Sequence, residues 1–106
     1  EDSWFVEDLE GRPLPPQWQG IDWEADPDWE FRTALDDDLD HVVDLYREAI
    51  ARSRAITADH DLDDAAAGRA VDCTLRYILV HLIEETARHL GHLDVLRELL
   101  DGTTGE

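Results

Sequence analysis

The sequence contains no methionine, no lysine and only one cysteine, Cys73. One cysteine cannot form a disulfide within the chain, so a reducing, cytoplasmic environment is expected. No apolar run approaches the roughly 20 residues needed to cross a bilayer, and no signal peptide is visible, so no membrane segment is predicted. Because the first residue is not methionine and residues 1–10 read like the last turns of a helix stopped by Gly11, we expect the natural start to be missing.

Positive charge is also scarce, and this scarcity excludes several classes of partner. The chain has 27 acidic residues against nine arginines, which gives a formal net charge of −18. Nucleic-acid backbones and anionic membranes need a basic surface, so neither is an expected partner. The acidic residues instead predict a solvated surface whose self-repulsion opposes compaction and weakens with added salt.

The length of 106 residues indicates a single domain, residues 1–106. Residues 11–28 hold all four prolines and two of the six glycines, so they form a long connector after the short N-terminal helix. We expect Trp18 and Trp23 to fold this connector onto the domain as a hydrophobic clamp, in preference to lining a ligand pocket.

A first long helix is predicted to begin near Pro27–Trp29, with Asp26 or Asp28 as its cap, and to end near Thr57–Asp59. Apolar residues follow at spacings of three and four and define one helical face: Phe31, Leu35, Leu39, Val42, Tyr46, Ala49 and Ile50. His60 then opens an acidic loop that runs to Asp72.

A second long helix is predicted from Cys73 or Thr74 to Leu100, with Asp101 and Gly102 as its stop. No segment has the pattern of a strand, so the fold class is all-α. Two long helices with one broad apolar face each cannot close a core alone. We therefore expect a homodimer, a swapped assembly, or N-terminal helices missing from this sequence. The apolar stripe of the second helix comprises Leu75, Ile78, Leu79, Leu82, Leu93, Leu96 and Leu100.

Glu85 and His89 occupy positions of this stripe at which apolar residues are expected, between Leu82 and Leu93. They are four residues apart, so their side chains project from one face of adjacent turns. Burying two such groups without partners costs about 2–7 kcal/mol each, and a divalent cation bound to both removes that cost. His92 is a candidate for a supporting position beside the cation, and a third ligand should come from another helix.

Other interpretations of the same residues remain open. Glu85 and His89 could form a hydrogen-bonded polar layer, or Glu85 could pair with Arg88 or Arg76. The two arginines could also orient an anionic substrate, although surface counter-charges are the favoured interpretation. Cys73 lies about 18 Å along the helix axis from Glu85, too far to join a metal site, and is predicted to be a small buried residue.

The stretch Thr74–Glu106, TLRYILVHLIEETARHLGHLDVLRELLDGTTGE, resembles the C-terminal helix of DinB-like proteins. The similarity is closest to an actinobacterial branch related to mycothiol-dependent maleylpyruvate isomerase, and WEFRTALDDDLDHVVDLYREAIARSRAI fits that branch more loosely. The resemblance implies a DinB-like four-helix bundle, of which this chain supplies mainly the two C-terminal long helices.

In that branch the resemblance implies a metal held by one histidine of the second helix and a Glu-x-x-x-His pair of the fourth, which matches Glu85 and His89. The first histidine would lie upstream of Glu1, so one ligand is expected outside this sequence. His41 is a poor substitute because it points away from the apolar face, and His60 lies in a loop. Zinc suits the ligands best, although nickel, iron and manganese also accept them.

The resemblance further implies a metal-dependent, thiol-linked transferase or isomerase acting on a small-molecule substrate. A low-molecular-weight thiol, mycothiol or bacillithiol, would be the cofactor or co-substrate. The alternative from another functional class is a non-catalytic helical binding or dimerisation module, in which Glu85 and His89 are only polar core residues.

Overall fold

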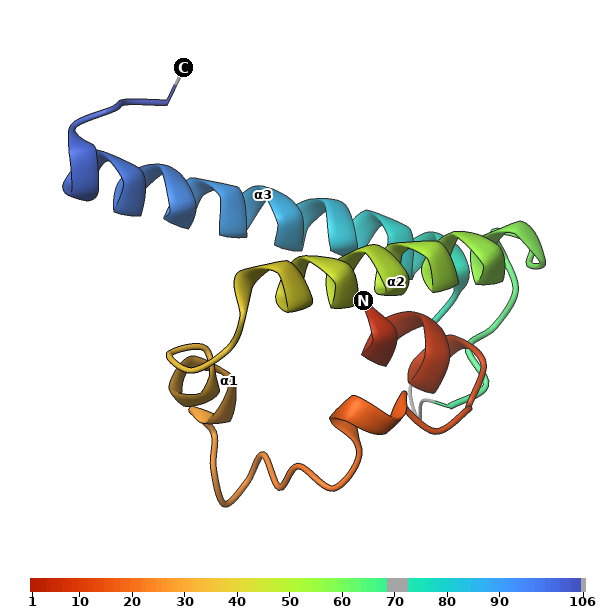
Figure 1. Ribbon diagram of the computed structural model, residues 1–106. Coiled ribbons are helices and arrows are strands. Elements are labelled where there is room, and N and C mark those ends of the chain that lie inside the picture. Colours follow the sequence, from red (N-terminus) through yellow and green to blue (C-terminus); the bar gives the residue numbers. More distant parts are fainter. Residues whose placement is uncertain (69–72, 106) are drawn as a thin grey trace. The chain divides into compact units, whose positions relative to one another are not determined.

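The computed structural model describes residues 1–68 and 73–105, and these residues are mainly helical (Figure 1). Within these two ranges no strand forms, and the β-type pairing is one isolated bridge between Ala65 and Thr74. The predicted all-α class is therefore confirmed. The elements in chain order are η1 (Ser3–Leu9), η2 (Pro16–Trp18), α1 (Trp29–Thr33), α2 (Leu39–Ala58) and α3 (Leu75–Asp101).

The chain forms two compact units, Glu1–Leu75 and Arg76–Glu106. In the first unit η1, a short π-helix, packs against α2. The buried apolar residues of this unit are Phe5, Val6, Leu9, Ala49, Ile56, Cys73 and Leu75. The prediction that Cys73 is a small buried residue is thus confirmed. Across the described residues, no helix has both the length and the apolar character that a membrane span requires.

A polar anchor fastens the start of the chain to α2. Asp2, whose side chain is only 6% exposed, accepts hydrogen bonds from Nε and Nη2 of Arg52 at 2.9 and 2.8 Å. Its Oδ2 atom also accepts a hydrogen bond from Nε1 of Trp18 at 3.0 Å. Burial alone would raise the pKa of Asp2, but the hydrogen bonds from Arg52 and Trp18 and the charge of Arg52 outweigh it, and the pKa lies below its ordinary value.

Trp18 and Trp23 contact residues outside the connector, although Trp23 remains 42% exposed. Trp18 is tied to Asp2, and its ring meets the ring of Trp29 edge to face at 6.4 Å. Trp23 makes a similar contact with Trp29 at 5.6 Å. Such edge-to-face pairs stabilise a packed arrangement by about 0.5–1.5 kcal/mol beyond burial alone, so they hold the connector against the start of α1.

The loop after α2 returns along the end of η1. The backbone N–H groups of Ala67 and Gly68 donate to the carbonyl oxygens of Leu9 and Asp8 at 2.9 and 2.8 Å. A Cβ atom at Gly68 would run into the carbonyl oxygen of Glu7, so only glycine fits this close approach. Residues 69–72 of the predicted acidic loop lie outside the described residues.

The prediction of one continuous helix from about residue 28 to residue 58 is wrong. The structure has two helices, α1 and α2, separated by residues 34–38. Asp38 is extended, with ψ of 128°, and its Oδ1 atom accepts hydrogen bonds from the N–H groups of Asp40 and His41 at 2.9 and 3.2 Å. It therefore caps a new helix, because three consecutive aspartates (residues 36–38) favour capping over helix continuation.

This break changes the expected apolar face as well. Three residues of the predicted apolar face are largely exposed in the first unit: Phe31, Leu35 and Leu39. The C-terminal half of α2 is the part that reaches the core, through Ala49 and Ile56. Its end at Ala58 agrees with the predicted boundary.

The bounds of α3 agree with the sequence to within two residues. The helix begins at Leu75 and ends at Asp101, and Gly102 follows with a positive φ of 76°. The N–H group of Gly102 donates to the carbonyl oxygen of Glu98 at 2.9 Å, which closes the last turn. Along the predicted stripe Ile78 is buried, whereas the C-terminal members Leu93, Leu96 and Leu100 are exposed.

Candidate metal centre

Glu85 and His89 lie together on α3, one turn apart, as their spacing requires. The Oε2 atom of Glu85 is 3.7 Å from the Nε2 atom of His89. The Glu85 side chain is 23% exposed and that of His89 is 69% exposed. The two groups thus converge on each other, and the imidazole is open to solvent.

The separation of these two atoms suits a shared cation. Two donors bound to one zinc ion at about 2.0–2.1 Å in a roughly tetrahedral arrangement lie about 3.3–3.4 Å apart. The observed 3.7 Å is longer than that value by about 0.3–0.4 Å. One carboxylate oxygen and one imidazole nitrogen are also ligands that zinc and its neighbours in the first transition series accept. The donor chemistry and the spacing of the pair therefore fit a divalent cation.

Two further side chains surround the carboxylate of Glu85. The guanidinium of Arg88 pairs with Oε2, one of the two salt bridges that the sequence left open. The Nε2 atom of His81 lies 3.5 Å from the other oxygen, Oε1. His81 was not among the candidate ligands predicted from the sequence. The i, i+4 rule that selected His89 applies equally to His81 on the preceding turn, and this signal could have found it.

The third ligand is not found among the described residues. Within residues 1–68 and 73–105, no three histidine, cysteine, aspartate or glutamate side chains are grouped so that they could hold a metal ion. The ring of His92 meets the ring of His89 edge to face at 6.3 Å, which places it beside the pair. The supporting position predicted for His92 remains a prediction.

Two other residues considered from the sequence, His41 and Cys73, lie in the first unit. His41 is exposed near the start of α2. Cys73 is buried two residues before α3, with its Sγ atom 3.8 Å from the carbonyl oxygen of Thr74. Arg76, at the start of the second unit, is exposed and lies one residue inside α3.

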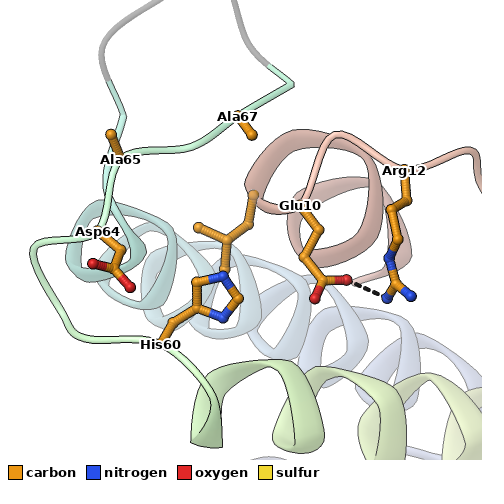
Figure 2. Close-up of a pocket in the computed structure, with 7 residues that line it drawn as sticks. Glu10, Arg12, His60, Asp64, Ala65 and Ala67 are labelled. Carbon is orange, nitrogen blue, oxygen red and sulfur yellow. Dashed lines mark ion pairs between the residues drawn. The ribbon is translucent and has the colours of Figure 1, made fainter.

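His60 borders an open cavity of about 470 Å³ in the first unit (Figure 2). Its Nδ1 atom lies 2.9 Å from the carbonyl oxygen of Ile56, so this nitrogen carries the proton that it donates. Figure 2 shows the ring between Asp64 and Glu10, and Glu10 is ion-paired with Arg12. The remaining lining residues are Leu9, Ala65 and Ala67.

The comparison with known families decides what kind of protein carries this pair. A family model described as mycothiol-S-transferase matches residues 1–102. The chain belongs to the mycothiol S-transferase family. This is a DinB-like family, so the resemblance seen in the second long helix is confirmed. Searches of curated proteins and of solved structures gave no match.

Membership also bears on the thiol expected from the sequence. The family indicates a mycothiol-dependent, transferase-like function for the chain. Between the two reaction types left open by the resemblance, it favours the transferase. Glu85 and His89 both lie within the matched residues, as do His81 and Arg88.

Proposed function

We propose that the chain is a metal-dependent mycothiol S-transferase in which Glu85 and His89 hold the cation, with zinc as the first candidate. The observation that carries the proposal is the 3.7 Å separation of Glu85 Oε2 and His89 Nε2, on adjacent turns of α3. It occurs in a chain that belongs to a mycothiol S-transferase family.

Each residue of the pair has a distinct part in this proposal. The Glu85 carboxylate supplies a negative charge that offsets part of the charge of a divalent cation. His89 supplies a neutral imidazole, with the lone pair on Nε2 and the proton on Nδ1. The net charge of −18 raises the local concentration of cations around the chain.

The exposure of His89 supports a catalytic use of the site in preference to a purely structural one. A structural zinc site is closed by four protein ligands, whereas a catalytic site keeps a position open. When bound there, a divalent cation would lower the pKa of a thiol that reaches its open position. The reaction would form an S–C bond between the thiolate and an electrophilic carbon of a small-molecule substrate, while the bond from that carbon to its leaving group breaks and the leaving group departs with the electron pair. The thiol proton would be lost to water.

The site as described supplies two protein ligands. We propose that the third comes from a segment upstream of Glu1, as the DinB-like arrangement implies, and that a small molecule fills the open position. Ion-paired Arg88 would then be released from Glu85 when the cation binds. The released guanidinium would then act as a surface counter-charge or pair with an anionic group of the substrate.

Elemental analysis of the purified protein, expressed with the segment proposed to lie upstream of Glu1, tests the proposal after incubation with zinc and dialysis. We expect bound zinc in the wild type and its loss in Glu85→Gln and His89→Ala, because each substitution removes one donor. Glu98→Gln is the matched control, since Glu98 is an exposed carboxylate on α3 that lies more than two turns from Glu85.

The same proteins are then assayed for S-conjugation of mycothiol to an electrophile. Activity that requires zinc and falls with both site variants supports the transferase. Zinc retained at the wild-type level by both variants would show that the pair is not the metal site. A wild type that binds no zinc and conjugates no mycothiol would favour the non-catalytic binding module.

A further inference from the structure

The half-buried partner of Glu85 is His81, which the proposed metal pair does not include. The Nε2 atom of His81 lies 3.5 Å from Oε1 of Glu85, and the two side chains are 25% and 23% exposed. His89, on the opposite side of Glu85 along the helix, is 69% exposed. The carboxylate is therefore flanked by one sheltered imidazole and one open imidazole, which face different oxygens.

The ring of His81 is itself held in place by two neighbours on α3. It stacks on the ring of Tyr77, with 5.9 Å between the ring centroids and an interplanar angle of 4°. Its Nδ1 atom lies 4.0 Å from Oε2 of Glu84. The residues lie at spacings of four and three from His81, so they belong to the preceding and following turns of the helix.

A carboxylate that binds a metal through one oxygen needs its other oxygen fixed, because rotation about the terminal bond would otherwise turn the ligand atom away. Hydrogen bonds from neighbouring side chains commonly perform this task and contribute about 10–100-fold to metal affinity. At Glu85 the oxygen that faces His89 is Oε2, and the oxygen that faces His81 is Oε1.

We propose that His81 is a positioning residue for the cation site. Its Nε2–H group donates to Oε1 of Glu85 and thereby directs Oε2 toward the cation shared with His89. This inference rests on the proposed function, since it assigns a role at the same site. It assigns His81 no bond to the metal, because the ring faces the oxygen that the cation does not use.

The test is a titration with Co²⁺ of the same protein, including the segment proposed to lie upstream of Glu1, followed by its visible absorption, with zinc competition to obtain dissociation constants. We expect His81→Ala to raise the dissociation constant about 10–100-fold and to shift the Co²⁺ absorption bands, because Oε2 loses its fixed direction. His81→Gln should recover much of the affinity, since its side-chain amide can donate to the same oxygen. His41→Ala is the matched control, being an exposed histidine on α2.

Far-ultraviolet circular dichroism of each variant distinguishes weaker binding caused by loss of the helix from weaker binding caused by loss of the hydrogen bond. A His81→Ala variant that is helical but binds Co²⁺ as the wild type does, while Glu85→Gln abolishes binding, would overturn the positioning role and leave the proposed site standing. Complete loss of binding in both His81→Ala and His81→Gln would show that His81 is itself a ligand, which also overturns the inference. A wild type without Co²⁺ binding would overturn both proposals.

Discussion

The guanidinium of Arg88 contacts Oε2 of Glu85, the same carboxylate oxygen that lies 3.7 Å from Nε2 of His89. Arg88 thus places its positive charge where a cation shared by Glu85 and His89 would bind. Its side chain is 59% exposed, so the pair resembles other surface ion pairs, which contribute about 0–1 kcal/mol. A divalent cation can displace such a group at little cost.

Replacing Arg88 by glutamine should therefore tighten cation binding. The competing ion pair is worth at most about 1 kcal/mol, so the dissociation constant for zinc should fall by about two- to fivefold. Competition titration with a coloured chelator measures the change. Arg97→Gln is the matched control, because Arg97 pairs with Asp101 on the same helix. Weaker zinc binding in the Arg88 variant would contradict competition and indicate that Arg88 supports the site.

The Asp2 anchor predicts how stability depends on pH. The pKa of Asp2 is lower in the folded chain than its ordinary value of 3.8. A lowered folded-state pKa stabilises the fold above the ordinary pKa, and this stabilisation is lost as the pH falls through the folded value. We expect the free energy of unfolding, measured with urea, to decline in this acidic range.

Asp2→Asn tests whether the anchor causes that decline. The variant cannot form a charged pair with Arg52, so it should be about 1–3 kcal/mol less stable near neutral pH. Its stability should also fall less steeply in acid, because the titrating group is absent. Asp44→Asn is the control, since Asp44 pairs with Arg47 at the surface of α2. Equal acid sensitivity in the wild type and Asp2→Asn would contradict the assignment.

Helix ends with strong local signals could be predicted from the sequence. The end of α3 depends on Gly102, whose positive φ glycine adopts easily, and the sequence places it correctly. The start of α2 was missed because apolar spacing continues across residues 34–38 and suggests one helix. Aspartate is a favoured capping residue, so Asp38 is the local signal in the sequence for this helix start.

The candidate site shows the same division between local and tertiary information. The approach of Glu85 and His89 follows from their spacing on one helix, and so does the contact of His81 with Glu85. Exposure does not follow from spacing, because it depends on which other elements cover the helix. The sequence also did not predict the ion pair of Asp2 with Arg52. These residues are 50 positions apart, and Asp2 is placed by the π-helix η1 that follows it.

Gly68 should tolerate no side chain. A methyl group at this position would meet the Glu7 carbonyl oxygen, and the backbone pairing of Gly68 with Asp8 leaves little room to move away. We expect Gly68→Ala to lower the free energy of unfolding by about 1–3 kcal/mol, the cost of overpacking. Gly91→Ala is the control, because nothing lies within 4 Å of its Cβ position in α3 and alanine favours helices. A Gly68 variant as stable as the wild type would show that the loop can shift.

Self-association is expected from the exposed leucines of the predicted stripe on α3, Leu93, Leu96 and Leu100. Contiguous exposed apolar residues favour contact with another protein surface, and we predict that this surface belongs to a second copy of the chain. Sedimentation equilibrium should give the mass of a homodimer, with association strengthened by salt because each copy carries −18. Leu96→Glu should dissociate it. Arg97→Glu is the control, because it makes the net charge of each copy more negative than Leu96→Glu does while leaving the leucines in place. Dissociation of the Arg97→Glu variant would therefore indicate charge repulsion in place of lost apolar packing. A wild-type monomer at high salt would contradict self-association.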